Sequence, residues 1–125
     1  MKTIRTQYTT NLPKITVVLP TMNRKKSLQE SLRSLYRIKY PENKLELVVI
    51  DNGSTDGTSL MVKENFPKIK LIALSRNIGF APALNLGIRK GQGLYIFVTN
   101  DDVIFDKNSL RELVKLAQSD EKIGI

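Results

Sequence analysis

The stretch LELVVIDNGSTDGT, residues 45–58, joins a mostly continuous apolar run to a polar loop that carries two glycines. A short, continuous apolar run rich in β-branched residues is typical of a strand covered on both faces, as in a parallel sheet. Three similar runs occur at residues 15–20, 69–74 and 94–98. The sequence therefore predicts four buried strands, the second of which covers residues 45–50.

Helical patterns separate these runs. Leu28, Leu32 and Leu35 recur at helical spacing, and Ser27 with Glu30 has the spacing of a capping box that would open this helix. The other predicted helices are residues 58–66, the stripe Ala81, Leu84 and Ile88 with its stop at Gly91, and the stripe Leu110, Leu113, Val114 and Ala117, opened by Ser109 and Glu112. Strand alternating with helix predicts an α/β fold: a Rossmann-like, open, mostly parallel sheet with helices on both faces.

The 125 residues fit one domain, for which we predict an N-terminal arm at residues 1–14 and a folded part at residues 15–125. The final residues EKIGI look like the opening of another strand, which suggests the first half of a longer domain. With neither cysteine nor histidine in the chain, no thiolate or imidazole can serve as acid, base or metal ligand, which favours oxygen groups in these roles. The absence of an apolar membrane span or signal block favours a cytoplasmic protein.

The formal net charge of +8 is concentrated in the first 50 residues. A basic face is compatible with an anionic membrane, a phosphate-bearing substrate or nucleic acid. The basic residues are scattered and not interleaved with aromatic residues, so a solvated surface is the better interpretation and we expect no nucleic-acid partner. Peripheral association with the inner face of a membrane remains an open alternative.

Polar loops follow all four predicted strands: PTMNR at residues 20–24, DNGSTDGT at 51–58, SRNIGF at 75–80 and TNDD at 99–102. Each alone would fit an ordinary turn. Ligands of open parallel sheets bind beyond the carboxyl ends of the strands, so the four loops together predict one binding crevice.

Asp101 and Asp102 form a like-charge pair directly after an apolar run, and such a pair needs compensation. Mg²⁺ or Mn²⁺ would supply it, because these ions take one or two protein carboxylates and complete their coordination with substrate phosphates and water. Asp51 could accept hydrogen bonds from a base or a ribose. The chain has no glycine-rich phosphate loop of the Walker or dinucleotide type, which disfavours an NTPase or a dehydrogenase.

Three blocks, ITVVLPTMNR, LELVVIDNGSTDGT and RNIGFAPALNLGIRKGQGLYIFVTNDD, resemble in order and spacing the donor-binding half of family 2 glycosyltransferases with the A-type fold. The resemblance implies that the chain binds a nucleotide-diphosphate sugar, with a UDP- or dTDP-sugar favoured. It implies inverting transfer to an acceptor hydroxyl. The acceptor, a polysaccharide or a lipid-linked molecule, is not indicated.

The resemblance also assigns roles to residues. Asp102 would bind the metal, with Asp101 near the metal, ribose and sugar, and Asp51 would contact the base. The other donor-binding residues that it implies are Pro20, Thr21, Asn23, Arg24, Asn77, Gly79 and Asn85. Asn100 departs from the family pattern, since many members carry an acidic residue there.

The catalytic base of the family lies outside the resembling region, so we expect this chain to bind donor weakly and to transfer little by itself. Three other functions stay open. They are a non-catalytic nucleotide-sugar-binding module, a nucleotidyltransferase, which would need a glycine-rich loop after the first strand, and a nucleic-acid binder, which rests on charge alone.

Overall fold

The computed structural model describes residues 12–119. The strand expected at residues 121–125 and most of the expected N-terminal arm lie outside these residues. The elements are β1 (Ile15–Thr21), α2 (Lys25–Tyr36), the short 3₁₀ helix η1 (Glu42–Lys44), β2 (Leu45–Asp51), α3 (Thr58–Asn65), β3 (Lys70–Ala73), α4 (Phe80–Lys90), β4 (Tyr95–Val98) and α5 (Ser109–Ser119). None of the helices within residues 12–119 is long and apolar enough to cross a membrane.

The four strands form one parallel sheet in the order β3-β2-β1-β4. From β1 the chain proceeds outward to β2 and β3, and then returns to place β4 on the other side of β1. The point where the direction reverses lies between β1 and β4, and in open α/β sheets this is where ligands bind. The predicted α/β class and parallel sheet are confirmed.

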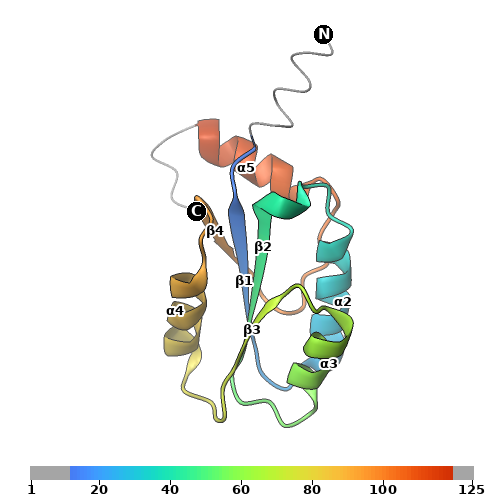
Figure 1. Cartoon of the computed structure of the whole chain (residues 1–125), viewed down its shortest axis with the longest axis vertical. Coiled ribbons are helices and arrows are strands. Elements are labelled where there is room, and N and C mark those ends of the chain that lie inside the picture. The colour runs from blue at the N-terminus through green and yellow to red at the C-terminus, as the bar shows by residue number, and fades with distance from the viewer. Residues whose placement is uncertain (1–11, 120–125) are drawn as a thin grey trace.

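Helices cover both faces of the sheet, as predicted (Figure 1). On one face, Ile15, Val17 and Leu19 of β1 are fully buried in a cluster that includes residues of α2, α3 and α5. On the other face α4 packs against Val18 and Ile50. A Cβ atom on Gly87 would lie 2.3 Å from Cδ1 of Ile50, so α4 lies this close to the sheet only because position 87 has no side chain.

The predicted face of α4 was partly wrong. Ala81 is exposed, while Ala83 and Gly87 are buried against the sheet and Leu84 is half-buried. A stripe of apolar side chains is a poor guide here, because the contact surface of α4 is made by its smallest residues.

Both predicted capping boxes are absent. Helix α2 begins two residues before Ser27, at Lys25, and Glu30 pairs with Arg33 at 2.9 Å instead of capping the helix. Ser109 is the first residue of α5, where its hydroxyl donates to the carbonyl of Asp106.

A carboxylate from another loop caps α2 in their place. One oxygen of Asp56 accepts the backbone N–H of Lys25 at 3.1 Å, and the other accepts the N–H of Thr58 at 3.0 Å. Asp56 therefore satisfies the first turns of α2 and α3 together. Burial acts to raise the pKa of Asp56, but hydrogen bonds from Thr58 and Lys25 outweigh it and lower that pKa.

Candidate functional site

A cavity of about 430 Å³ opens at the carboxyl ends of β1 and β4. Seven predicted site residues line it: Pro20, Thr21, Arg24, Asn77, Gly79, Asp101 and Asp102. The sheet places three of them. Pro20 and Thr21 end β1, which extends one residue beyond its predicted end, and Asp101 follows β4 by a short turn. The strands next to the reversal point thus carry the polar groups of the cavity.

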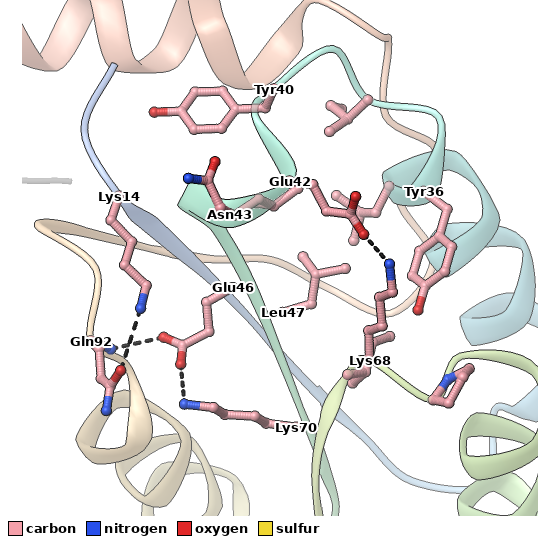
Figure 2. Close-up of a pocket in the computed structure, with 15 residues that line it drawn as sticks. Lys14, Tyr36, Tyr40, Glu42, Asn43, Glu46, Leu47, Lys68, Lys70 and Gln92 are labelled. Carbon is pink, nitrogen blue, oxygen red and sulfur yellow. Dashed lines mark hydrogen bonds and ion pairs between the residues drawn. The ribbon is translucent and has the colours of Figure 1, made fainter. Parts of the chain in front are cut away.

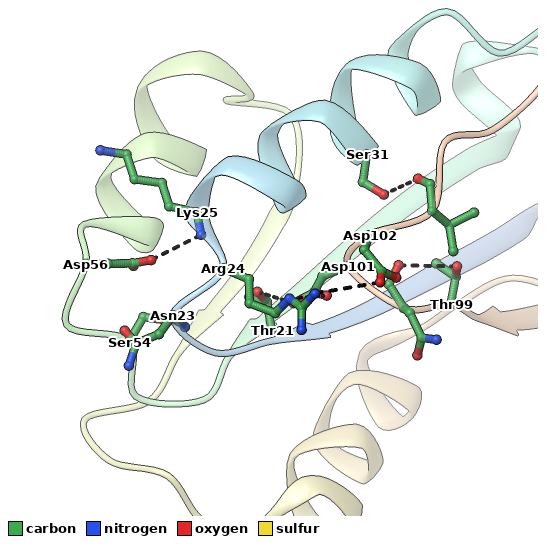
Figure 3. A network of polar contacts seen from close by, with 12 residues as sticks. Thr21, Asn23, Arg24, Lys25, Ser31, Ser54, Asp56, Thr99, Asp101 and Asp102 are labelled. Atoms are coloured by element: carbon green, nitrogen blue, oxygen red, sulfur yellow. Dashed lines mark hydrogen bonds and ion pairs between the residues drawn. The ribbon is translucent and has the colours of Figure 1, made fainter.

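The carboxylate of Asp101 is buried and already has two partners (Figure 3). The hydroxyl of Thr21 donates to its Oδ2 at 2.9 Å, and Nε of Arg24 lies 3.3 Å from its Oδ1. Nη2 of Arg24 also lies 3.7 Å from Oδ2 of Asp102, whose side chain is exposed. One guanidinium therefore compensates both charges of the acidic pair in this structure.

Helix α2 holds the loop that follows the acidic pair. The buried hydroxyl of Ser31 donates to the carbonyl of Val103, and the hydroxyl oxygen of Ser34 accepts the N–H of Phe105 at 2.9 Å. Neither serine was singled out from the sequence. The sequence feature that could have identified them is the occurrence of two serines on the otherwise apolar face of a helix. Their hydroxyl groups can hydrogen-bond to a loop that packs on this face.

Asp51 is 2% exposed and does not line the cavity. Its Oδ1 accepts the N–H of Ser54 at 2.9 Å, and its Oδ2 accepts the hydroxyl of Ser59. Gly53, in the same turn, has φ +84°, and a Cβ there would lie 2.6 Å from the backbone of Arg76. Asp51 thus organises the turn after β2 in this structure, and its predicted contact with a base stays a prediction.

Asn52 joins the three loops on this side of the cavity. Its N–H donates to the carbonyl of Thr21, and its side-chain amide donates to Asn77 Oδ1 at 3.0 Å and to the carbonyl of Gly79 at 3.1 Å. Its Oδ1 accepts the N–H of Ile78 at 2.9 Å. From the sequence Asn52 was interpreted only as part of a turn, although its buried amide sets the position of two predicted site residues.

Asn23 and Asn85 do not line the cavity. Asn23 has φ +52°, and its side-chain oxygen accepts the N–H of Thr55 at 2.7 Å, so it ties the loop after β1 to the loop after β2. Asn85 lies exposed in the middle of α4. Their predicted donor contacts remain predictions.

Two apolar side chains at the cavity are unusually exposed. Phe80 at the start of α4 is 63% exposed, and Met22 after β1 is 40% exposed. An exposed aromatic ring beside polar groups is typical of sites that pack against a planar or sugar-like ligand. Neither residue was singled out from the sequence.

The donor atoms of the cavity fit a hard divalent cation. Asp101 and Asp102 offer carboxylate oxygens, and within residues 12–119 no group of three or more acidic side chains is placed to hold a metal ion by itself. Mg²⁺ and Mn²⁺ suit such a pair, because ligands beyond one or two carboxylates can come from substrate phosphates and water.

A larger cavity of about 740 Å³ lies at the opposite, amino-terminal end of the sheet (Figure 2). Glu46 of β2 lies beside it with its carboxylate almost fully buried, and accepts the hydroxyl of Thr16 at 2.6 Å, the N–H of Gln92 at 2.8 Å and the ammonium of Lys70. Burial acts to raise the pKa of Glu46, but these three donors lower it to about 2. This carboxylate is saturated by the protein itself.

Curated relatives match most of the chain. A probable glycosyltransferase, YdaM, of Bacillus subtilis is 29% identical over 119 residues, which are 90% of this chain and 28% of the relative. A poly-beta-1,6-N-acetyl-D-glucosamine synthase of Staphylococcus aureus is 30% identical over 113 residues, 88% of this chain and 27% of the relative. The chain therefore spans little more than a quarter of the length of these relatives.

Solved structures share the fold of the described residues. A mannosyltransferase from Pyrobaculum calidifontis, solved with GDP-Man and Mn²⁺, superposes with a TM-score of 0.81 at 34% identity over 92% of this chain and 35% of that one. S. aureus TarS in complex with UDP-GlcNAc gives 0.77 at 28% identity over 85% and 31%. The family model for glycosyl transferase family 2 matches residues 16–125. Because this match covers nearly the whole sequence, the chain belongs to glycosyl transferase family 2.

Proposed function

We propose that this chain is the donor-binding part of an inverting glycosyltransferase, and that it binds a nucleotide-diphosphate sugar together with Mg²⁺ or Mn²⁺. The observation that carries the proposal is the acidic pair Asp101–Asp102, held beside Arg24 in a cavity at the reversal point of the sheet. The negative oxygens of a diphosphate need a positive group beside them, and a divalent cation takes its oxygen ligands from the protein and from the diphosphate together. This cavity offers the protein's share of each.

Different polar groups of the cavity would contact different parts of the donor. Asp102, exposed at the cavity, would hold the cation, with Asp101 behind it oriented by the hydroxyl of Thr21. The guanidinium of Arg24 is within reach of anions in the same cavity. Asn77 and Gly79, fixed by Asn52, would line the part occupied by the nucleotide, and Phe80 offers a planar apolar surface there.

A bound divalent cation would supply Lewis-acid stabilisation of the charge that develops on the leaving diphosphate. The residues of this chain would orient the donor and hold its phosphates. Removal of the acceptor proton needs a general base, and the family resemblance implies that this base is a carboxylate outside these 125 residues. We therefore assign no base here, and we expect the isolated chain to bind donor but to transfer little.

The experiment that tests the proposal is calorimetric titration of UDP, dTDP and GDP into the chain, with Mn²⁺ and with chelator. We expect one nucleotide to bind only with the cation, and the substitution Asp102→Asn to weaken that binding by at least about tenfold. A UDP- or dTDP-sugar is our predicted donor. GDP belongs in the series because the similar structures include a GDP-Man complex as well as a UDP-GlcNAc complex.

Asp106→Asn is the matched control, since Asp106 is exposed, lies four positions further along the chain and does not line the cavity. Nucleotide binding that survives both chelator and Asp102→Asn would contradict the metal-dependent site. The acceptor, whether polysaccharide or lipid-linked, and any association with the inner face of a membrane belong to the whole protein and are proposals at that level.

A further inference from the structure

We infer that Arg24 is a built-in counterion of the acidic pair, which competes with the divalent cation when no donor is bound and moves to the diphosphate when cation and donor bind together. This inference rests on the proposed function and adds an order and a coupling to it. Arg24 would thereby make the site bind cation and nucleotide jointly and disfavour the cation alone.

The geometry of the guanidinium carries the first step. Its Nε lies 3.3 Å from Asp101 Oδ1 and its Nη2 lies 3.7 Å from Asp102 Oδ2, so it lies between the two carboxylates that the cation would use (Figure 3). Neither distance is that of a short charge-assisted hydrogen bond. The contact is therefore electrostatic and can be exchanged at small cost.

The second step rests on the exposure of the side chain and on the absence of a capping role. The side chain of Arg24 is about half exposed. Arg24 is the N-cap residue of α2, and from there its side chain reaches into the cavity. The helix start does not depend on this side chain, because Asp56 caps the N–H of Lys25 and no side-chain hydrogen bond comes from Arg24. The guanidinium can thus move without opening the helix.

Charge balance gives the direction of the movement. The pair carries two negative charges and Arg24 returns one, so the three groups together have a net charge of about −1. A divalent cation added to this arrangement would by itself neutralise the two carboxylates, so the positive charge of Arg24 would lose its counter-charge. A diphosphate brings new negative oxygens, and a planar guanidinium binds these in a forked geometry. Cation and diphosphate together therefore give Arg24 a better partner than it loses.

The test compares Arg24→Gln with wild type in two titrations: Mn²⁺ alone, followed by electron paramagnetic resonance of the free ion, and then UDP and GDP at saturating Mn²⁺. We expect Arg24→Gln to tighten binding of Mn²⁺ alone on the order of threefold to fivefold, as loss of a partly exposed ion pair would. We expect it to weaken binding of the preferred nucleotide on the order of tenfold. Arg24→Lys keeps the charge but not the forked geometry of the guanidinium. Its affinities for Mn²⁺ and for the nucleotide should both lie between those of wild type and Arg24→Gln.

Lys26→Gln is the matched control for net charge, because Lys26 is exposed two residues away and does not line the cavity. It should change neither affinity by more than about twofold. If Arg24→Gln weakens or leaves unchanged the binding of Mn²⁺ alone while Asp102→Asn abolishes Mn²⁺ binding, the counterion role is overturned and the proposed metal site stands. If neither wild type nor Arg24→Gln binds Mn²⁺ with or without nucleotide, both are overturned.

Discussion

The two ends of the sheet each hold a buried carboxylate beside a threonine of β1, and they differ in how that carboxylate is satisfied. At the amino-terminal end, Glu46 is held by a hydroxyl, a backbone N–H and an ammonium. At the carboxyl end, Asp101 has one hydrogen bond from Thr21 at 2.9 Å, a contact with Arg24 at 3.3 Å, and a like charge next to it. We call the first end closed, because donors from the protein satisfy its carboxylate. We call the second end open, because its two carboxylates share one guanidinium and can still bind a cation.

Cavity size alone does not favour the end that we propose for the donor. The larger cavity lies beside Glu46, where the partners of that carboxylate come from the protein, while the smaller one contains the acidic pair. In our proposal the acidic pair, which shares one guanidinium between two charges, and not the cavity volume, marks the donor-binding end of this sheet.

The largest expected effect comes from neutralising the two carboxylates in a matched pair of isosteric variants. Glu46→Gln should lower the free energy of unfolding by about 2–3 kcal/mol, because the buried network loses its negative charge and one of its two acceptor oxygens. Asp101→Asn should cost less than about 1 kcal/mol, since the lost hydrogen bond from Thr21 is offset by relief of repulsion with Asp102. Urea denaturation measures both. Equal costs would mean that the two ends are equally closed.

Glu46, at the amino-terminal end, should account for much of the loss of unfolding free energy at acidic pH, which we call the acid limb of the stability profile. The pKa of Glu46 is lowered from 4.5 to about 2 in the folded chain, so its stabilisation is complete above the unfolded pKa and is lost as pH falls through the folded one. We expect the wild-type chain to lose up to about 3 kcal/mol between pH 4.5 and pH 2. Glu46→Gln should flatten this part of the curve.

Glu42→Gln is the control for that experiment. The exposed Glu42 also has a lowered pKa, which comes from its ion pair with Lys68. Because solvent screens this pair, its removal should leave the acid limb nearly as steep as in wild type. A limb that flattens equally in both variants would remove the special role of Glu46.

Much of the carboxyl end could be predicted from sequence, because its signals are local. Continuous β-branched runs identified the strands, and the rule that parallel strands bind ligands beyond their carboxyl ends placed Thr21, Asp101 and Asp102 at one edge of the sheet. The amino-terminal network was not predicted. Glu46, Thr16 and Gln92 come from different parts of the chain, and nothing next to any of them in the sequence shows which partner it will meet.

The same reason explains what was wrong about the helix starts. A capping box is a local pattern, and two candidate boxes had the right spacing, yet α2 is capped by Asp56, whose carboxylate comes from 31 residues away. A tertiary acceptor outcompeted the local one because the loop after β2 already lies against the loop after β1, through Asn23 and Ser54. Local spacing predicts that a helix starts nearby but does not choose its cap.

A smaller effect should come from Asp56, the shared cap of α2 and α3. It lies at the carboxyl end of the sheet, and its two oxygens are satisfied by backbone N–H groups of the protein. Asp56→Ala should lower the free energy of unfolding by about 1–2 kcal/mol, since it leaves the first turns of α2 and α3 without their acceptor. Asp56→Asn should recover part of the loss, because one amide oxygen can still accept one N–H. Urea denaturation of the three chains is the measurement, and an Asp56→Ala chain as stable as wild type would show that water replaces the cap.

The smallest effect tests whether α2 sets the position of the acidic pair. Ser31→Ala removes the hydroxyl that donates to the carbonyl of Val103, directly after Asp102, and should cost about 1 kcal/mol of stability. If the open end depends on this support, binding of Mn²⁺ with nucleotide should also weaken by about twofold, because the carboxylates lose part of their fixed position. Ser27→Ala on the same helix is the control, since Ser27 is only half-buried and lies one turn earlier. A Ser31→Ala chain that loses stability but keeps its affinity would show that Thr21 and Arg24 alone position the pair, so the open end would be independent of the core beneath it.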